Sequence, residues 1–112
     1  MSMVAGLRVP HERDVKPLSF RNLRLTADAI VGECIRQDIL ARSGKFGGLH
    51  ILPSGPDHAR LAVLLEEVGE VARELNEGLM RESGVDKDKL VRELIQVGAC
   101  AAAWATALES PQ

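Results

Sequence analysis

Five glutamates lie in the stretch EEVGEVARELNEG, which runs from Glu66 to Gly78. On a helix, residues three or four positions apart project side by side, so Glu67 and Glu70 would be neighbours. Further along the chain, Glu93 and Gln96 repeat this spacing. Like charges this close repel each other, and a bound Mg²⁺ ion, which prefers oxygen ligands, would offset the repulsion. These two pairs are therefore the first candidates for chemistry.

A solvated helix face is the alternative explanation, because amphipathic helices usually carry their charges away from the core. The positions of the pairs favour a cation site instead. Glu67 and Glu70 lie beside the apolar residues of their helix, and Glu93 and Gln96 flank apolar residues of the later one. Two helices that pack through these faces would bring the two pairs together, as in other carboxylate-bearing helix bundles.

Three helices are predicted to position these residues. The first follows Thr26 as its N-cap and ends near Arg42, before a loop rich in glycine and proline. The second begins at Asp57 and ends at Gly78 or Gly84. The third is capped by Asp86 and runs to about Leu108. The apolar stripe that the second helix is expected to bury consists of Leu61, Leu64, Leu65, Val68, Val71, Ala72 and Leu75.

The predicted fold class is therefore all-α, a small bundle of about three main helices. Residues 1–25 show no sustained period and are expected to be irregular, and residues 26–110 form a single helical domain. From Val97 to Ala103 the last helix is small and apolar around its whole circumference, so it should be covered on every side. We expect a second copy to supply that cover, which predicts a homodimer or homotetramer.

The bulk composition excludes several function classes. A net charge of −2 over 112 residues argues against binding of a nucleic acid polymer. No apolar run reaches the roughly 20 residues that span a membrane, and no signal peptide is evident. Cys34 and Cys100 are isolated from each other in the sequence and are expected to be reduced core residues. These features predict a cytoplasmic location.

The two acidic motifs carry a family resemblance. Glu66-Glu67-x-x-Glu70 followed by Glu93-x-x-Gln96 resembles the EExxE…ExxD signature of the MazG-like, all-α nucleoside triphosphate pyrophosphohydrolases. The likeness covers roughly residues 26–108. It implies hydrolysis of a nucleoside or deoxynucleoside triphosphate to the monophosphate and pyrophosphate, with Mg²⁺ or alternatively Mn²⁺. Clearing of unwanted nucleotides from the pool is the role that this implies.

The resemblance also implies roles for individual residues. Glu67, Glu70, Glu93 and Gln96 would bind the metal, and Glu66 would be an additional ligand or would help position the attacking water. Gln96 departs from the pattern, because the family has an aspartate there. An amide oxygen can coordinate an ion but carries no negative charge, so we expect weaker binding of one ion, or one ion fewer.

The loop after the first helix is where the resemblance places the nucleobase. Phe46 could stack on a base, and Lys45 or His50 could contact phosphate or base edges; a capping loop with Phe46 in the core is the alternative. Two other functions compete with the enzyme. One is a weak or inactive relative that binds a nucleotide or a partner, and the other is a helical oligomerisation module whose glutamates are merely solvated.

Overall fold

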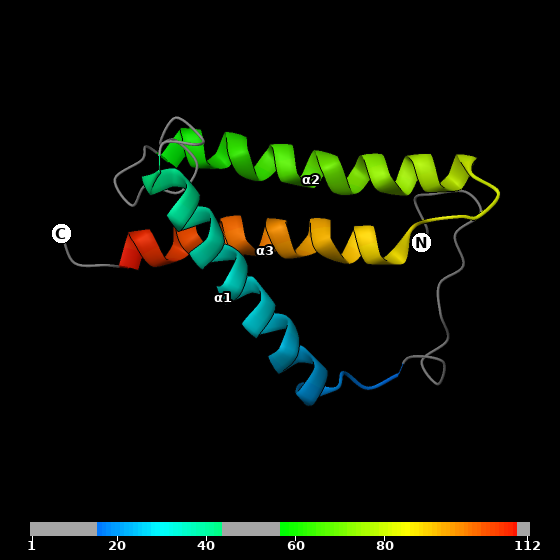
Figure 1. The fold of residues 1–112 in the computed structure, drawn as a ribbon, viewed down its shortest axis with the longest axis horizontal. Coiled ribbons are helices and arrows are strands. Elements are labelled where there is room, and N and C mark those ends of the chain that lie inside the picture. Colours follow the sequence, from blue (N-terminus) through cyan, green and yellow to red (C-terminus); the bar gives the residue numbers. More distant parts are fainter. Residues whose placement is uncertain (1–15, 44–56, 110–112) are drawn as a thin grey trace, which may run out of the picture.

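The structure is a computed structural model that describes residues 16–43 and 57–109. Within these ranges it is all-helical and has no strand, as predicted. The helices are α1 (Phe20–Arg42), α2 (Asp57–Met80) and α3 (Lys87–Glu109). Figure 1 shows α2 and α3 running alongside each other as a hairpin while α1 crosses them obliquely. None of the three is long and apolar enough to cross a membrane.

The first helix begins seven residues before its predicted start. Ser19 is the N-cap: its hydroxyl accepts a hydrogen bond from Asn22 N at 3.2 Å. Thr26, the predicted cap, lies within the helix and donates to Asn22 O. The prediction of an irregular segment up to residue 25 is therefore wrong for residues 20–25. This first part of α1 is fully exposed, so no apolar period marks it, and only the serine cap indicates where it begins.

The hairpin between α2 and α3 follows the predicted signals closely. The helix α2 ends two residues after Gly78, and Gly84 adopts a left-handed conformation in the turn, with φ of 79°. Asp86 then caps α3, since its carboxylate accepts a hydrogen bond from Lys89 N at 3.1 Å. The predicted start and end of α3 are both confirmed to within a residue or two.

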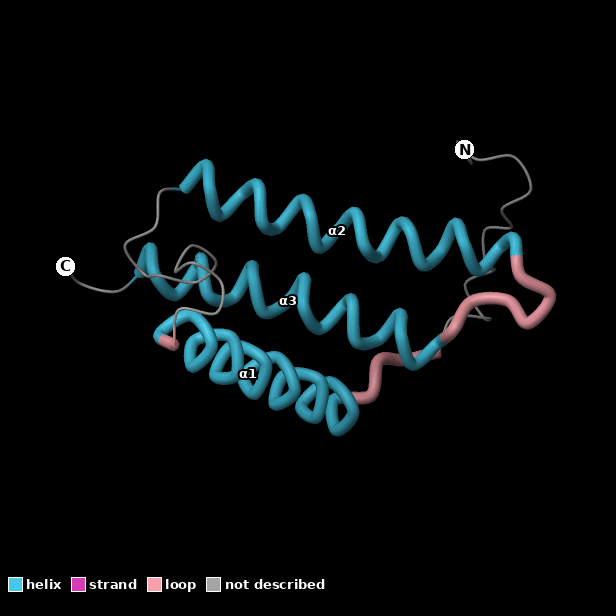
Figure 2. Tube along the Cα trace, turned by 45° about the horizontal axis from the view of Figure 1, so that its top comes forward, coloured by secondary structure: helices cyan, strands magenta, loops and turns pink. Residues whose placement is uncertain are grey.

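The third helix is the central layer of the fold. Both α1 and α2 pack against α3, and within the described ranges they do not pack on each other; Figure 2 shows α3 between them. Gly98 marks the crossing with α1, because a Cβ atom there would lie 2.8 Å from Ile30 Cδ1. The thiol of Cys34 donates to Ala99 O at 3.4 Å beside this crossing. Small residues thus let α1 approach α3 closely.

A buried carboxylate joins α2 to α3 at the turn end of the hairpin. Glu74 is only 1% exposed. It accepts hydrogen bonds from Arg81 Nη2 at 2.7 Å and Asp86 N at 3.3 Å, and Lys89 Nζ lies 3.4 Å away. The hydrogen bond from Arg81 is the main reason that the pKa of Glu74 is lowered, and the contacts with Asp86 N and Lys89 add to it. Glu74 is therefore ionised and has a structural role.

The orientation of α2 differs from the prediction. Five of the seven stripe residues are exposed, with Leu65 as much as 59% exposed, whereas Leu64 and Val71 are half-buried. The side that faces α3 instead carries Arg60, which is 5% exposed, together with Glu74 and Gly78. The prediction of a buried leucine stripe is thus wrong for this single chain. The close contact of Gly78 with Val85 and the ionic contacts of Glu74 hold the side of α2 that carries Glu74 against α3. Most of the leucines therefore remain exposed.

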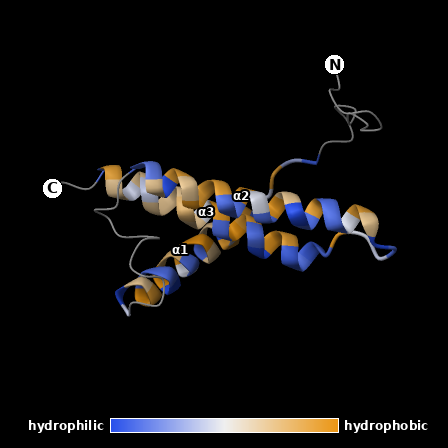
Figure 3. Cartoon of the chain, turned by 90° about the horizontal axis from the view of Figure 1, so that it is seen from above, coloured by the Kyte–Doolittle hydropathy of each residue, from blue (hydrophilic) through white to orange (hydrophobic). Residues whose placement is uncertain are grey.

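Large hydrophobic residues are exposed on all three helices. Figure 3 shows that hydrophobic and hydrophilic residues alternate along each of them. Among the described residues, the buried hydrophobic side chains are only Ala41 and Ala99. In the alanine-rich part of α3, Ala99 is completely buried, Ala101 is exposed and the other residues from Val97 to Ala103 are half-buried. The helices α1 and α2 therefore cover this part of α3 incompletely, and the second copy expected to complete the cover stays a prediction.

The close contact at Gly78 gives a stability prediction. A Cβ atom at this position would overlap Val85 Cγ2 and would lie 2.7 Å from Val85 Cα, which is backbone. We expect Gly78→Ala to lower the free energy of unfolding by about 1–3 kcal/mol. Thermal denaturation followed by circular dichroism measures this.

Gly69→Ala is the matched control in the same helix. A Cβ at Gly69 meets nothing within 4 Å. Alanine has a higher helix propensity than glycine, so this variant should be as stable as the wild type or more stable by about 0.5–1 kcal/mol. Equal melting temperatures for the two variants would contradict the packing of the hairpin described above.

Candidate functional site

Contacts at the two ends of the hairpin place the acidic pairs opposite each other. At one end Glu74 contacts Asp86 and Lys89. At the other end Trp104 Nε1 donates to Asp57 Oδ1 at 2.8 Å. Counted from these contacts, the antiparallel register puts the turn of α2 that carries Glu67 and Glu70 at about the same level as the turn of α3 that carries Glu93 and Gln96. The two motifs, separated in the sequence, are thus brought to one level of the bundle.

Burial separates the members of this group. Glu67, Glu70, Glu93 and Gln96 are all half-buried, which fits side chains at the edge of the contact between α2 and α3. Glu66 is exposed and lies on a different side of α2. Four of the five predicted site residues are therefore half-buried at one level of the hairpin, whereas Glu66 is exposed. We use the name carboxylate cleft for the set of Glu67, Glu70, Glu93 and Gln96, which refers to their common level and not to a cavity.

The thiol of Cys100 reports where Glu67 lies. Burial is the main cause that raises the pKa of Cys100 to about 11, and the next largest is the negative charge of Glu67. A charge has this effect only at short range, so Glu67 lies near Cys100. Cys100 is one helical turn beyond Gln96 on α3. The position agrees with the register of the hairpin.

The remaining glutamates of the acidic stretch differ in what they contact. Glu70 has a loose ion pair with Arg73, 3.7 Å long and partly exposed, which contributes little to stability. Glu74 is bound by the basic residues of the turn and by a backbone amide. The sequence shows these glutamates as one charged run, but only Glu67 and Glu70 belong to the carboxylate cleft.

The side chains of the carboxylate cleft offer the oxygen ligands that a hard cation prefers. Three carboxylates and one amide oxygen are available, and Mg²⁺ is usually bound by a few carboxylates and by water. Among the described residues, however, no three His, Cys, Asp or Glu side chains are grouped closely enough to form a preformed metal site. Binding therefore requires rotation of the long glutamate side chains, which the half-exposed positions permit.

A hollow of about 460 Å³ opens beside the cleft, between α1 and α3. Its polar lining comes from Glu33 and Arg36 of α1 and from Arg92 and Gln96 of α3. Glu33 was not among the residues predicted from the sequence. Its position next to Cys34, a predicted core residue, could have placed it near the inward side of α1. Assigning it to this hollow would also have required the point at which α1 crosses α3.

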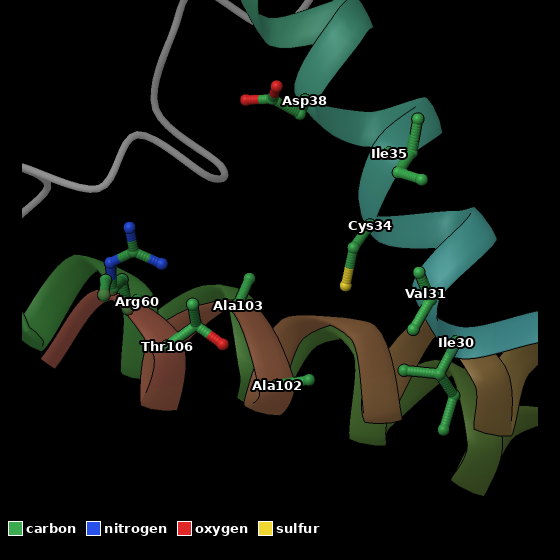
Figure 4. A pocket seen from close by; sticks show the side chains of 10 residues that line it. Ile30, Val31, Cys34, Ile35, Asp38, Arg60, Ala102, Ala103 and Thr106 are labelled. Atoms are coloured by element: carbon green, nitrogen blue, oxygen red, sulfur yellow. The ribbon is translucent and has the colours of Figure 1, made fainter. Parts of the chain in front are cut away.

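A second hollow, of about 370 Å³, lies on the other side of this crossing. Figure 4 shows Cys34 pointing into it from α1, while Arg60 reaches toward it from α2. Apart from Asp38, Arg60 and Thr106, its walls are mostly aliphatic. This apolar cavity lies close to the ends of α1 and α2 that flank the loop of residues 44–56. The predicted substrate-binding residues Lys45, Phe46 and His50 belong to that loop and lie outside the described residues.

Comparison with known proteins adds no assignment. No protein-family model, curated protein or solved structure matches this chain.

The position of Glu67 can be tested through Cys100. Replacing Glu67 by Gln removes a negative charge that disfavours the thiolate, so the pKa of Cys100 should fall. At pH 9 and in the presence of EDTA, we expect Cys100 to react with iodoacetamide severalfold faster in this variant. Mass spectrometry of the peptide containing Cys100 distinguishes it from Cys34.

Glu66→Gln removes the same charge from the adjacent, exposed position and serves as the control. It should leave the alkylation rate of Cys100 unchanged. An unchanged rate in Glu67→Gln, or an equal increase in both variants, would show that Glu67 does not face α3.

Proposed function

We propose that this chain is a Mg²⁺-dependent, MazG-like nucleoside triphosphate pyrophosphohydrolase. The observation that supports this most directly is the register of the hairpin, which sets the half-buried Glu67 and Glu70 of α2 at about the same level as the half-buried Glu93 and Gln96 of α3. A solvated acidic face would place these side chains outward and the leucines inward. The opposite orientation brings acidic oxygen ligands to a helix interface, where a cation would offset their repulsion.

The residues of the carboxylate cleft would have different roles in such a reaction. Glu67, Glu70 and Glu93 would hold the cation through carboxylate oxygens, and Gln96 through its amide oxygen. A bound Mg²⁺ neutralises charge on the phosphates and makes a coordinated water easier to deprotonate. Water adds its oxygen to the α-phosphorus, and the bond to the bridging oxygen breaks. Pyrophosphate leaves with that oxygen, and the monophosphate remains. Glu66 is exposed, so its proposed role is limited to positioning water that enters the site.

We also propose that the nucleoside part of the substrate binds in the apolar cavity beside Cys34. The apolar cavity beside Cys34 has room for a planar base, and its polar residues are few, as in ligand pockets generally. Asp38 of α1 and Arg60 of α2 line this cavity. Lys45, Phe46 and His50 lie between those two residues in the sequence and remain our proposal for base and phosphate contacts. Nucleoside and deoxynucleoside triphosphates are the proposed substrate class.

A catalytically weak relative is the second candidate, and one observation favours it. Gln96 supplies no charge, and the described carboxylates are not gathered into a preformed site. Such a protein would bind a nucleotide with Mg²⁺ but release no pyrophosphate. The third candidate, an oligomerisation module with solvated glutamates, is disfavoured because Glu67 and Glu70 are half-buried against α3.

We also propose that the protein forms a homodimer or homotetramer through the outer face of α2. This face carries Leu61, Leu65, Val68 and Leu75, all exposed in the single chain. Fully burying a wholly exposed side chain of this kind contributes about 1.5–3 kcal/mol. These four retain 42–59% of their exposure, so a second copy that covers them would gain roughly half of that for each. Among the described residues, sixteen large hydrophobic residues are exposed, which is more apolar surface than soluble monomers usually leave uncovered.

The enzymatic proposal predicts a selective effect at Glu70. We expect the wild-type protein to release pyrophosphate from nucleoside triphosphates only when Mg²⁺ is present. Glu70→Gln should abolish this release, because the variant loses a metal-binding charge, while its helicity stays unchanged. Glu77→Gln, an exposed position on the same helix, should keep full activity. Pyrophosphate detection over a panel of canonical and modified nucleotides measures both.

Activity that survives in Glu70→Gln would contradict the assigned site. Wild-type protein that is stabilised by Mg²⁺ and nucleotide in thermal melting, yet releases no pyrophosphate, would favour the second candidate. Absence of any stabilisation by divalent ions would favour the oligomerisation module.

The oligomer gives a separate prediction. Leu65→Lys places a charge in the centre of the outer face of α2, and Leu65 makes little contact within its own chain. We expect this variant to elute as a 12.1 kDa monomer in size-exclusion chromatography with light scattering, whereas the wild type elutes as a multiple of that mass. Glu77→Lys, outside the leucine face, should remain oligomeric. A wild-type monomer would overturn this part of the proposal.

A further inference from the structure

The first half of α1 lacks cover in the single chain. All residues from 20 to 29 are exposed, although Phe20 and Leu23 are large and hydrophobic. Figure 1 shows this half of the helix leading away from the hairpin, beyond the crossing with α3. Regularly spaced apolar residues on an uncovered helix indicate a surface that meets another protein chain.

The exposed apolar residues continue the covered side of the same helix. Along α1, one set of positions alternates at spacings of three and four, which is the heptad period of a coiled-coil seam. The set consists of Phe20, Leu23, Ala27, Ile30, Cys34, Gln37 and Ala41. Its last two residues are buried, and the two in its middle are half-buried at the crossing with α3. We call the three uncovered residues, Phe20, Leu23 and Ala27, the open α1 seam.

The outer face of α2 has the same period. Its exposed residues recur at spacings of four and three over about five helical turns. They are Leu61, Leu65, Val68, Ala72, Leu75 and Leu79. Helices with this period pack side by side along their contact. The open α1 seam is about 10 Å long, so it can lie entirely on part of this face.

Charge favours contact between these two surfaces over contact of either surface with itself. The segment of residues 16–27 carries Lys16, Arg21 and Arg24 and contains no acid. The helix α2 carries six acids and two arginines, and Glu66 is exposed directly beside Leu65. Two copies of the α1 segment would repel each other, whereas the α1 segment of one copy and α2 of another attract.

We propose that the open α1 seam of each copy docks on the outer face of α2 of another copy. This inference rests on the proposed homo-oligomer, because it names the segment that covers the α2 face. In a dimer the contact occurs twice about a two-fold axis, so one association covers both apolar surfaces of both chains. Arg21 and Arg24 lie at the rim of the contact, where acids of α2 oppose them.

Mixing two variants tests this pairing. Leu23→Asp places a charge in the open α1 seam, and Leu65→Lys places one in the outer face of α2. Each variant alone should elute as a 12.1 kDa monomer in size-exclusion chromatography with light scattering. An equimolar mixture should regain the oligomeric mass of the wild type. In a mixed pair one contact is unchanged, and the other joins two opposite introduced charges.

Leu25→Asp is the matched control on the same helix. Leu25 is 62% exposed but lies on the side of α1 opposite the open α1 seam, because successive residues turn by about 100°. This variant should keep the oligomeric mass of the wild type. Far-UV circular dichroism should show equal helicity in all three variants, since each replaced leucine is exposed in the single chain.

Each other outcome contradicts a particular claim. The open α1 seam does not dock on α2 if Leu23→Asp keeps the mass of the wild type, if Leu25→Asp is also a monomer, or if the mixture stays monomeric. The proposed oligomer through α2 would stand in these cases. A wild-type monomer would overturn both this pairing and the proposed oligomer. Pyrophosphate release by the wild type tests the enzymatic proposal separately.

Discussion

The orientation of α2 on α3 is the main constraint on this fold: Glu74 is buried and Glu67 is half-buried, whereas Leu61, Leu65 and Leu75 are exposed. A single chain would gain more by burying the leucines. What the hairpin has instead is a set of polar contacts, among them those of Glu74 with Arg81, Asp86 and Lys89. The two proposals made above follow from this orientation: a cation would offset the charge of the half-buried glutamates, and a second copy would cover the exposed leucines.

Glu74 and Asp57 determine where along the hairpin that cleft forms. Glu74 is buried among basic groups and an amide at one end, and Asp57 accepts a hydrogen bond from Trp104 at the other. Breaking a buried ionic contact leaves an uncompensated charge, so a shift of register by one turn would be costly. The same contacts that hold the hairpin together thus align Glu67 with the turn that carries Gln96.

Much of the fold follows from local signals in the sequence. The cap at Asp86, the turn at Gly84 and the end of α1 at Arg42 each depend on a few neighbouring residues. The face of α2 that is buried could not be predicted in this way, because leucine periodicity indicates an apolar stripe but not which partner covers it. That Glu33 lines the same hollow as Gln96 could not be predicted for a similar reason, because it depends on where α1 crosses α3, a contact between residues distant in the sequence.

We infer that side chains from α2 and α3 jointly bind a divalent cation, and paramagnetic Mn²⁺ can locate that ion residue by residue. Mn²⁺ added at substoichiometric amounts broadens the amide NMR signals of residues near its binding site. If the two helices share the ion, the signals of residues 67–70 and 93–96 disappear first and together, and excess Mg²⁺ restores them. Broadening that begins at exposed acids such as Glu82 and Asp88, or that spreads evenly over the surface, would rule out a shared site.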